Sequence, residues 1–404
     1  PALAARTADG ESSEASGGAP CEAARTPASA EWMREERSRL PEPWRAEEIR
    51  IDADPALFLP RPELRKLKQE ALAELESLRK RAPERVVLPE EEALARLHGF
   101  HICENRSRDG VADGKPELHV LVRSMEQIEA LRGLDLASVS MDFEYGVPRE
   151  EALEEIRRLG FRAGAATPRV MMPGERKANA ALADLAPDLL LVRNLGALRL
   201  LRGSGIPLVA DLSLNVANSI AAERMLDAGF ARVVPAADLN GDQLLRMASA
   251  GRVSPDRFEV PLYHWMPAFF MRHCVFASCL TGADRPGECG APCRRHRVEM
   301  VDRTGEGLVL ASDPFCRNTA YRARPQSSLR LLPRLLEAGV RRFRFEALRE
   351  TPEELRARVR LALDALSGRT SPEEALKSLG ALDLTGISEG RLFKNDGWKD
   401  RKKA

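Results

Sequence analysis

The sequence has almost no net charge, no long apolar stretch and no secretory signal. Lys and Arg number 62 against 61 Asp and Glu, so overall charge makes no case for binding nucleic acid or an acidic membrane surface. Any such binding must be local. No run of about eighteen apolar residues exists, and the N-terminus lacks a basic and then apolar pattern. We therefore expect a soluble, cytoplasmic protein without a membrane partner.

Several catalytic motifs are missing as well. The chain contains no Gly-rich phosphate loop, no G-x-S-x-G nucleophile elbow and no H-E-x-x-H metal motif. A metallopeptidase would need an open metal position with a base beside it. Spacing alone therefore supports neither a serine nucleophile nor a zinc peptidase centre.

What is present indicates one large domain and an appendage, since the chain has 404 residues of which 44% are hydrophobic. Residues 1–30 are small, polar and rich in Gly, Ser and Pro, so we expect them to be disordered. Residues 31–100 are expected to form a small helical module or linker, with an amphipathic helix beginning just after Pro62. The main domain is expected at 115–370, followed by a C-terminal tail at 371–404.

Short β-branched runs alternate with helical segments in the main domain. The helices expected at 149–160, 217–229 and 326–339 each end at a glycine. Eight strands alternating with helices over about 250 residues predict an α/β fold, a (β/α)8 TIM-like barrel, with a doubly wound open sheet as the alternative. The eight strands are expected at 118–122, 137–143, 162–172, 188–194, 207–214, 231–236, 258–264 and 340–348.

Cysteine is scarce and unevenly placed. Of the seven cysteines, Cys21 and Cys103 stand alone, and the other five fall within 43 residues. A secreted disulfide scaffold would be shorter and richer in cysteine, and clustered thiols in a reducing compartment more often bind metal. In a barrel, this group lies in a cysteine-rich loop at 264–326, an insertion after the seventh strand at the face that carries active sites. The five clustered residues are Cys274, Cys279, Cys289, Cys293 and Cys316.

Converging thiolates favour zinc or an iron–sulfur cluster over hard cations. Zinc ribbons prefer two tight pairs with two intervening residues, whereas this chain has one pair, Cys289 and Cys293, with three. This spacing favours an iron–sulfur cluster, and zinc remains the alternative. Cys279 is a candidate substitute ligand or a small buried thiol. The competing interpretation is that all five are scattered core cysteines.

The stretches "EVPLYHWMPAFFMRHCVFASCLTG", "CGAPCRRHRVEMVDRTG" and "DPFCRNTAY" resemble the cysteine signature of peptidase family U32, the collagenase-like proteins. The likeness is to the C-terminal barrel of their long forms, and it covers residues 55–365. The earlier "LFLPRPELRKLKQEAL" resembles the end of the collagenase-associated domain of unknown function. Because the chain begins with Pro1, we expect a processed product or the C-terminal half of a longer protein, with an upstream U32 barrel as its partner.

The resemblance implies a TIM-like barrel with a [4Fe–4S] cluster that supports hydroxylation of RNA bases, in rRNA or tRNA, or of ubiquinone precursors. The ligands carried over are Cys274, Cys289, Cys293 and Cys316. The family name suggests a collagenase-like protease instead, and a third possibility is a non-catalytic partner barrel with a structural metal site. One departure is that many members carry a further cysteine after the strand histidine, where this sequence has "WMPAFF".

Polar residues at the ends of the expected strands are candidates for substrate binding or catalysis. The stretch "DLSLNVAN" stands out, because Asp and Asn at a strand-to-helix junction can both cap the helix and hydrogen-bond a ligand. Taken individually, each such residue is more often a cap or a barrel-lining group than a catalyst. The catalytic candidates are Asp211, Asn215, His264 and Glu346. The wider set adds Asp142, Glu144, Arg169, Arg193, Asn194, Ser213 and Asp238.

Two local patches are basic: "CRRHRVEMVDR" and the terminal "RLFKNDGWKDRKKA", the second with Phe393 and Trp398 interleaved. Such patches can follow RNA phosphates while aromatic rings stack on unpaired bases. Solvated surface is the alternative for both.

Overall fold

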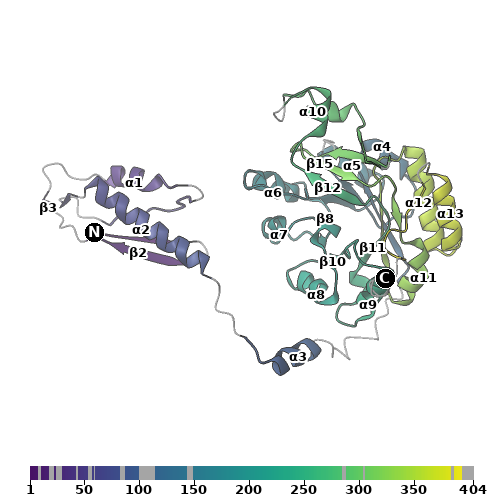
Figure 1. The fold of residues 1–404 in the computed structure, drawn as a ribbon, viewed down its shortest axis with the longest axis horizontal. Coiled ribbons are helices and arrows are strands. Elements are labelled where there is room, and N and C mark those ends of the chain that lie inside the picture. Colours follow the sequence, from purple (N-terminus) through teal and green to yellow (C-terminus); the bar gives the residue numbers. More distant parts are fainter. Residues whose placement is uncertain are drawn as a thin grey trace. The chain divides into compact units, whose positions relative to one another are not determined.

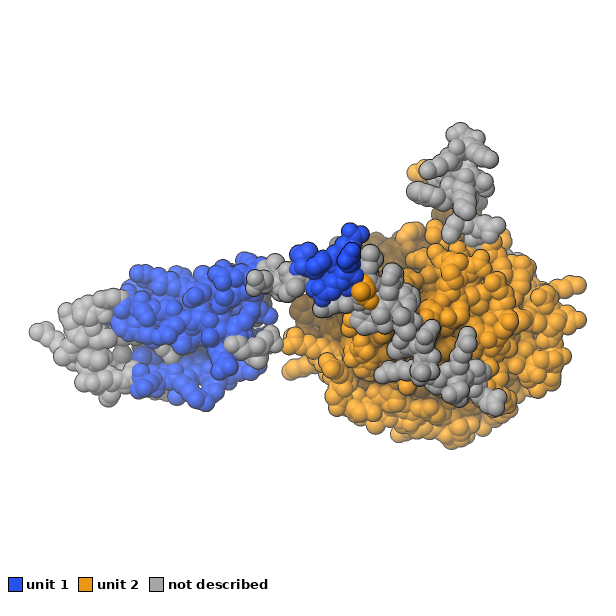
Figure 2. All heavy atoms as spheres, turned by 90° about the horizontal axis from the view of Figure 1, so that it is seen from below, with its two compact units in different colours: residues 1–92 blue, residues 93–404 orange. Residues whose placement is uncertain are grey.

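The computed structural model divides the chain into two compact units, Pro1–Glu92 and Ala93–Ala404 (Figure 2). None of the helices it describes is long and apolar enough to cross a membrane. The description covers residues 1–7, 11–17, 22–23, 30–41, 44–52, 57–58, 60–81, 87–99, 114–142, 149–283, 288–303, 305–383 and 386–393.

The centre of the first unit is the helix α2 (Arg61–Lys80). The sequence predicts this helix, and Pro62 lies in its first turn, where the missing amide hydrogen costs nothing. Its buried residues recur at helical spacing and form one apolar stripe. They are Leu64, Leu67, Ala71 and Leu75.

Within residues 1–30, which were expected to be disordered, the described parts contain β-strands. β1 (Ala2–Arg6) pairs antiparallel with β2 (Ser12–Ser16), and Leu3 and Ala15 are buried in the same apolar cluster as the α2 stripe. Small side chains are enough here because the helix covers the paired strands and supplies most of the apolar surface. The other elements are α1 (Ala30–Ser38), β3 (Glu22–Ala23) paired with β4 (Leu57–Phe58), and α3 (Glu90–Gly99) at the boundary between the units.

The second unit is built on a nine-stranded sheet in the order β10-β9-β8-β7-β6-β5-β17-β11-β16. Every one of the eight expected strands is present, because each β-branched or apolar run becomes a buried parallel strand. The strands are β5 (Glu117–Val122), β6 (Ser138–Asp142), β7 (Ala163–Ala166), β8 (Leu189–Val192), β9 (Leu208–Ala210), β10 (Arg232–Val233), β11 (Glu259–His264) and β17 (Arg342–Glu346), with β16 (Gln326–Ser327) antiparallel to β11.

The strand order decides between the two expected folds. Neighbours follow the chain without reversing direction, so the doubly wound alternative is wrong. An isolated parallel bridge between Val233 and Phe258 links β10 to the residue before β11, and the sheet therefore curls as a half-barrel toward closure (Figure 1). This is an α/β fold of the TIM-like kind.

Helices lie along the outside of the curled sheet (Figure 1). Gly160 and Gly229 follow two of them in the left-handed region, at φ 87° and 106°, and this explains why the expected helices stop there. The helices are α4 (Met125–Ala130), α5 (Arg149–Arg158), α6 (Arg176–Asp184), α7 (Leu195–Leu201), α8 (Ser219–Asp227), α9 (Gly241–Ser249), α11 (Leu332–Glu337), α12 (Pro352–Leu366) and α13 (Pro372–Ala381).

Two expected segments take a different form. Residues 264–326, expected as a long loop, contain a second sheet in the order β12-β15-β14-β13 and the short helix α10, because brief apolar runs there pair with one another. Residues 371–404, expected as a tail, begin with α13, whose Ala375 and Leu379 are buried in the main core. The elements of the second sheet are β12 (Pro267–Met271), β13 (Glu299–Val301), β14 (Gly307–Ser312) and β15 (Asn318–Tyr321), with α10 at Val275–Leu280.

Candidate functional site

Charged side chains collect where the parallel strands end. Arg123 follows β5, Asp142 ends β6, Arg193 follows β8, Asp211 follows β9 and Glu346 ends β17. Because parallel strands place their carboxyl ends at one edge, these residues share the face that carries active sites in barrel enzymes. All five are at least nine-tenths buried.

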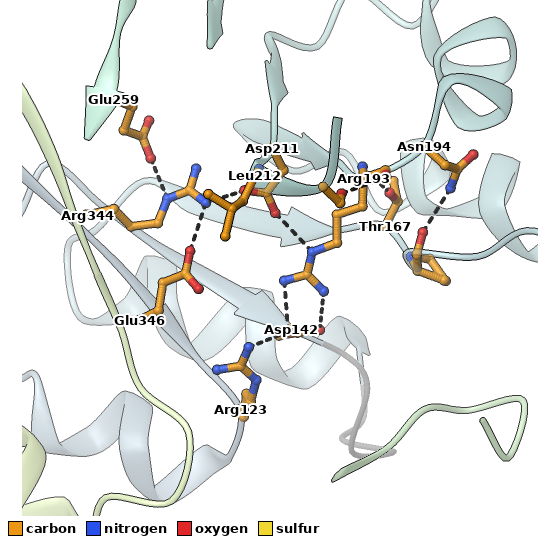
Figure 3. A network of polar contacts seen from close by, with 12 residues as sticks. Arg123, Asp142, Thr167, Arg193, Asn194, Asp211, Leu212, Glu259, Arg344 and Glu346 are labelled. Carbon is orange, nitrogen blue, oxygen red and sulfur yellow. Dashed lines mark hydrogen bonds and ion pairs between the residues drawn. The ribbon is translucent and has the colours of Figure 1, made fainter. Parts of the chain in front are cut away.

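These residues form one continuous ion-pair network (Figure 3). Both terminal nitrogens of Arg193 donate to the two oxygens of Asp142, at 3.0 and 2.9 Å, and its Nε donates to Asp211 Oδ2 at 2.9 Å. Arg123 Nη2 lies 3.1 Å from Asp142 Oδ2. The network thus joins strands β5, β6, β8 and β9 through charge-assisted, partly bidentate contacts.

Arg344 extends the network from β17. Its Nη1 donates to Asp211 Oδ1 at 2.6 Å and to Glu346 Oε1 at 3.2 Å, and its Nε donates to Glu259 Oε1 at 2.6 Å. The side chain of Arg344 is 1% exposed, which is tolerable for a charge only because three carboxylates surround it.

The surrounding charges keep Asp211 and Glu259 ionised. Burial by itself would raise the pKa of Asp211, but the positive charges of Arg344 and Arg193 outweigh it and hold the pKa below its ordinary value. Burial opposes ionisation of Glu259 too, and the nearby cations, Arg344 foremost, lower its pKa to about 2. Neither group is suited to accept a proton at neutral pH.

His264 ends β11 within reach of this network but is not held by it. Burial lowers the pKa of the imidazole, and its Nδ1 has no hydrogen-bond partner among the described residues. The ring borders a small cavity of about 30 Å³ together with Gln326 and Ser328. His264 is therefore a neutral, buried imidazole at the barrel mouth.

The other expected candidates mainly shape turns. Asn215 is exposed and has a left-handed backbone, φ 54°, at the end of the short turn after Asp211. Asn194 caps α7, accepting from Ala197 N at 2.7 Å. Asp238 is exposed, and Glu144 lies outside the described residues.

Arg169 and Ser213 also have local roles. Arg169 places its guanidinium 3.7 Å from the centre of the Phe270 ring. The Ser213 hydroxyl donates to Arg193 O at 2.7 Å. Both contacts lie beside the ion-pair network, so they support its position without adding an acid or base.

One buried group beside the network escaped the sequence analysis. Glu350 Oε1 accepts from Tyr263 Oη at 2.7 Å and from Trp265 Nε1 at 2.8 Å, and Arg358 Nη1 lies 3.3 Å away. Burial and the Glu350 charge raise the pKa of Tyr263 well above its ordinary range. The available signal was the pair of aromatic residues around the strand-end histidine, "YHW", each carrying a polar group that needs a partner when buried.

The four expected ligand cysteines line one open cavity of about 950 Å³ on this face of the barrel. Cys274 precedes α10, Cys293 lies in the turn Pro292–Arg294, and Cys316 lies in the turn between β14 and β15. Cys289 completes the set. Arg123 lines the same cavity and so connects it to the ion-pair network.

Local hydrogen bonds fix two of these cysteines. The buried Asn318 donates from Nδ2 to Cys274 Sγ at 3.7 Å and accepts from Val275 N through Oδ1 at 2.7 Å. Cys316 has a left-handed backbone, φ 62°, and its amide donates to Asp313 O at 3.0 Å. The turn between β14 and β15 therefore presents Cys316, and the start of α10 presents Cys274.

The other three cysteines of the cavity lie near enough to affect the ionisation of Cys316. Burial raises the pKa of Cys316, and the negative charges of Cys274, Cys289 and Cys293 raise it further. Among the described residues, however, no three His, Cys, Asp or Glu side chains are arranged so that they could hold a metal ion as they stand. The structure brings the four cysteines to one cavity but does not show a formed ligand shell.

The remaining cysteines do not join this set. Cys279 is exposed and is not part of the cavity wall. Cys21 and Cys103 lie outside the described residues. The basic stretch after Cys293 does join the cavity: its exposed residues Arg294, Arg295, His296 and Arg297 all line it.

Comparison with known proteins gives one family. The model of peptidase family U32 matches residues 171–399. The solved U32 peptidase Mk0906 is 14% identical, covering 59% of this chain and 96% of that one, with a TM-score of 0.36. Dihydropteroate synthase from Thermus thermophilus is 16% identical, covering 60% of this chain and 92% of that one, with a TM-score of 0.31. The spore cortex-lytic enzyme SleL of Bacillus cereus is 10% identical, covering 60% of this chain and 73% of that one, with a TM-score of 0.32. No curated protein matches the chain.

Proposed function

This chain belongs to peptidase family U32, and from that premise we propose that the cavity lined by the four cysteines, called the cysteine cavity below, holds an iron–sulfur cluster and that the protein acts in the hydroxylation of an RNA base. The observation that carries the proposal is the shared cavity, because the start of α10, the stretch 289–293 and the turn between β14 and β15 all contribute cysteines to its lining. Scattered core cysteines would have no reason to meet at the mouth of the barrel.

The donor set fits such a group. Four thiols are the usual ligands of an iron–sulfur cluster, and the four here are close enough to perturb the ionisation of Cys316. A bound cluster would supply one-electron redox chemistry. Since the side chains do not form a ligand shell as they stand, the proposal requires them to draw together on loading.

The cavity also suits a nucleotide of an RNA strand. Its volume of about 950 Å³ is near the upper end of the usual range for small-molecule sites, roughly 300–1,000 Å³. Arg294 and Arg297 line the cavity, both are exposed, and neither forms an ion pair with a carboxylate among the described residues. Guanidinium groups in this position can bind backbone phosphates while the base enters the cavity.

The ion-pair network acts as a positioning device in this proposal. Asp142, Asp211 and Glu346 are each held by an arginine, so they orient Arg123 and the strand ends rather than transfer protons. The same pairing weakens the collagenase-like alternative, because a hydrolase would need one of these carboxylates free to act as a base.

A structural metal site without catalysis is the second candidate. Four thiolates fill a tetrahedral shell, whereas catalytic metal sites usually keep one position open. This candidate predicts a zinc-loaded, colourless protein whose cysteine variants lose stability and nothing else.

Anaerobic purification followed by an absorption spectrum separates these possibilities. We expect a broad absorption band at about 400 nm that disappears in Cys289→Ser. The band should survive in the control Cys279→Ser, because Cys279 lies outside the cavity. Mass spectrometry of RNA nucleosides from cells carrying each variant then tests the reaction. A colourless protein, or an unchanged nucleoside profile in Cys289→Ser cells, would contradict the proposal.

A further inference from the structure

A second cavity, of about 240 Å³, lies at the opposite end of the half-barrel, where the strands begin. Arg232 opens β10, Arg342 opens β17 and Glu117 opens β5, while Arg162 and Arg257 lie just before β7 and β11. This volume is about eight times the ~30 Å³ that one water occupies in the liquid. We call it the arginine pocket. Its charged lining residues are Glu117, Arg162, Arg232, Asp256, Arg257 and Arg342.

The arginine pocket carries an excess of positive charge. Four guanidinium groups face two carboxylates, and Arg342 takes both of these: its Nε lies 3.2 Å from Glu117 Oε2 and its Nη1 lies 3.5 Å from Asp256 Oδ2. The other three arginines are left without either lining acid as a partner.

Two of those three contact only backbone oxygens in the described part of the chain. Arg162 Nη2 donates to Asp188 O at 3.3 Å, and Arg257 Nη1 donates to Ala231 O at 3.0 Å. Both side chains are exposed, so nothing holds their remaining donors away from the cavity.

Arg232 is the buried member, with a side chain 12% exposed. Its only carboxylate contact among the described residues is Glu259 Oε2 at 3.5 Å, and the other oxygen of Glu259 is bound to Arg344. Burial lowers the pKa of Arg232, and the like charges of Arg342 and Arg344 act in the same direction. With Glu259 shared between Arg232 and Arg344, four arginines stand against two carboxylates and part of a third, so the pocket keeps between one and two uncompensated positive charges.

We propose that the arginine pocket binds a phosphate group, from either a small phosphate ester or a nucleic-acid backbone. Guanidinium forks match tetrahedral oxyanions in geometry and charge, and a phosphate group, with one or two negative charges, would offset the excess positive charge. The site lies at the opposite ends of the strands from the cysteine cavity and shares no lining residue with it. It is independent of the proposed redox function.

Titration calorimetry of the full chain with inorganic phosphate, against chloride at equal ionic strength, tests the proposal. We expect Arg162→Gln and Arg257→Gln each to weaken phosphate binding about tenfold, because each removes a charge-assisted donor. Arg334→Gln is the matched control, since Arg334 pairs with Asp242 on the surface outside the pocket. Absence of phosphate binding by the unaltered chain, or equal affinity in all three variants, would overturn the proposal.

An RNA oligonucleotide distinguishes the two sources of the phosphate. If the backbone is the ligand, Arg162→Gln lowers RNA affinity and reduces its salt dependence. If RNA binding is unchanged while phosphate binding falls, the ligand is a small phosphate ester. Neither variant touches a cysteine, so a chain that shows the absorption band but ignores phosphate refutes only this inference.

Discussion

Replacing Asp211 by Asn tests whether the ion-pair network holds the barrel mouth together. Asp211 is 3% exposed and accepts from Arg193 at 2.9 Å and from Arg344 at 2.6 Å. The amide preserves the shape of the side chain but removes the charge that both guanidinium groups share. Arg193 keeps Asp142, and Arg344 keeps Glu259 and Glu346, as partial compensation.

The expected loss in the free energy of unfolding is about 3 kcal/mol, the lower end of the roughly 3–5 kcal/mol measured when one partner of a buried ion pair is removed. Asp242→Asn is the matched control. Its pair with Arg334 is 62% and 58% exposed, so we expect a loss below about 1 kcal/mol.

Urea unfolding followed by hydrogen exchange at the β8 and β9 amides measures both variants on the sheet itself. The pKa of Asp211 is lowered in the folded chain, so its stabilisation is present at neutral pH and is lost as the pH falls below about 4. The difference in the free energy of unfolding between wild type and Asp211→Asn should therefore shrink as the pH is lowered. A loss for Asp211→Asn no larger than that for Asp242→Asn would refute the reasoning.

Two further predictions concern other parts of the chain. The pKa of Glu259 is lowered to about 2 in the folded chain, so the stabilisation that its charge provides is complete above pH about 4.3 and is lost as the pH falls toward 2. Glu259→Gln should therefore flatten the pH dependence of the urea midpoint across that interval. An unchanged slope would contradict this. Leu67→Ala should destabilise the first unit by about 2–5 kcal/mol, because Leu67 is 1% exposed in its small core. Hydrogen exchange should then speed up in α2 and stay constant in β5, whereas equal protection in both would argue against separate units.

The strands of the half-barrel were predictable because each is a local pattern. Runs such as "LHVLV" and "DLLLV" are long enough to become buried parallel strands, and the glycines that end α5 and α8 are visible beside them. The antiparallel pairing of β1 with β2 was not predictable in this way. The small side chains of these strands favour no structure until α2 covers them.

The candidate site divides along the same line. Cysteine spacing identified which thiols to consider, and the structure places Cys274, Cys289, Cys293 and Cys316 on one cavity wall. The carboxylates at the strand ends could likewise be identified from the sequence. Their roles could not, because a partner can lie far away in the chain: Asp211 pairs with Arg344, 133 residues later.

The sequence by itself determined the strand positions, the helix ends and the clustering of thiols, since each depends on residues near one another in the chain. The tertiary structure alone decided which charges pair, which arginines remain unbalanced and which cavity the cysteines share. Electrostatic energy depends on distance and burial, and neither can be read from residue order when the partners come from different strands.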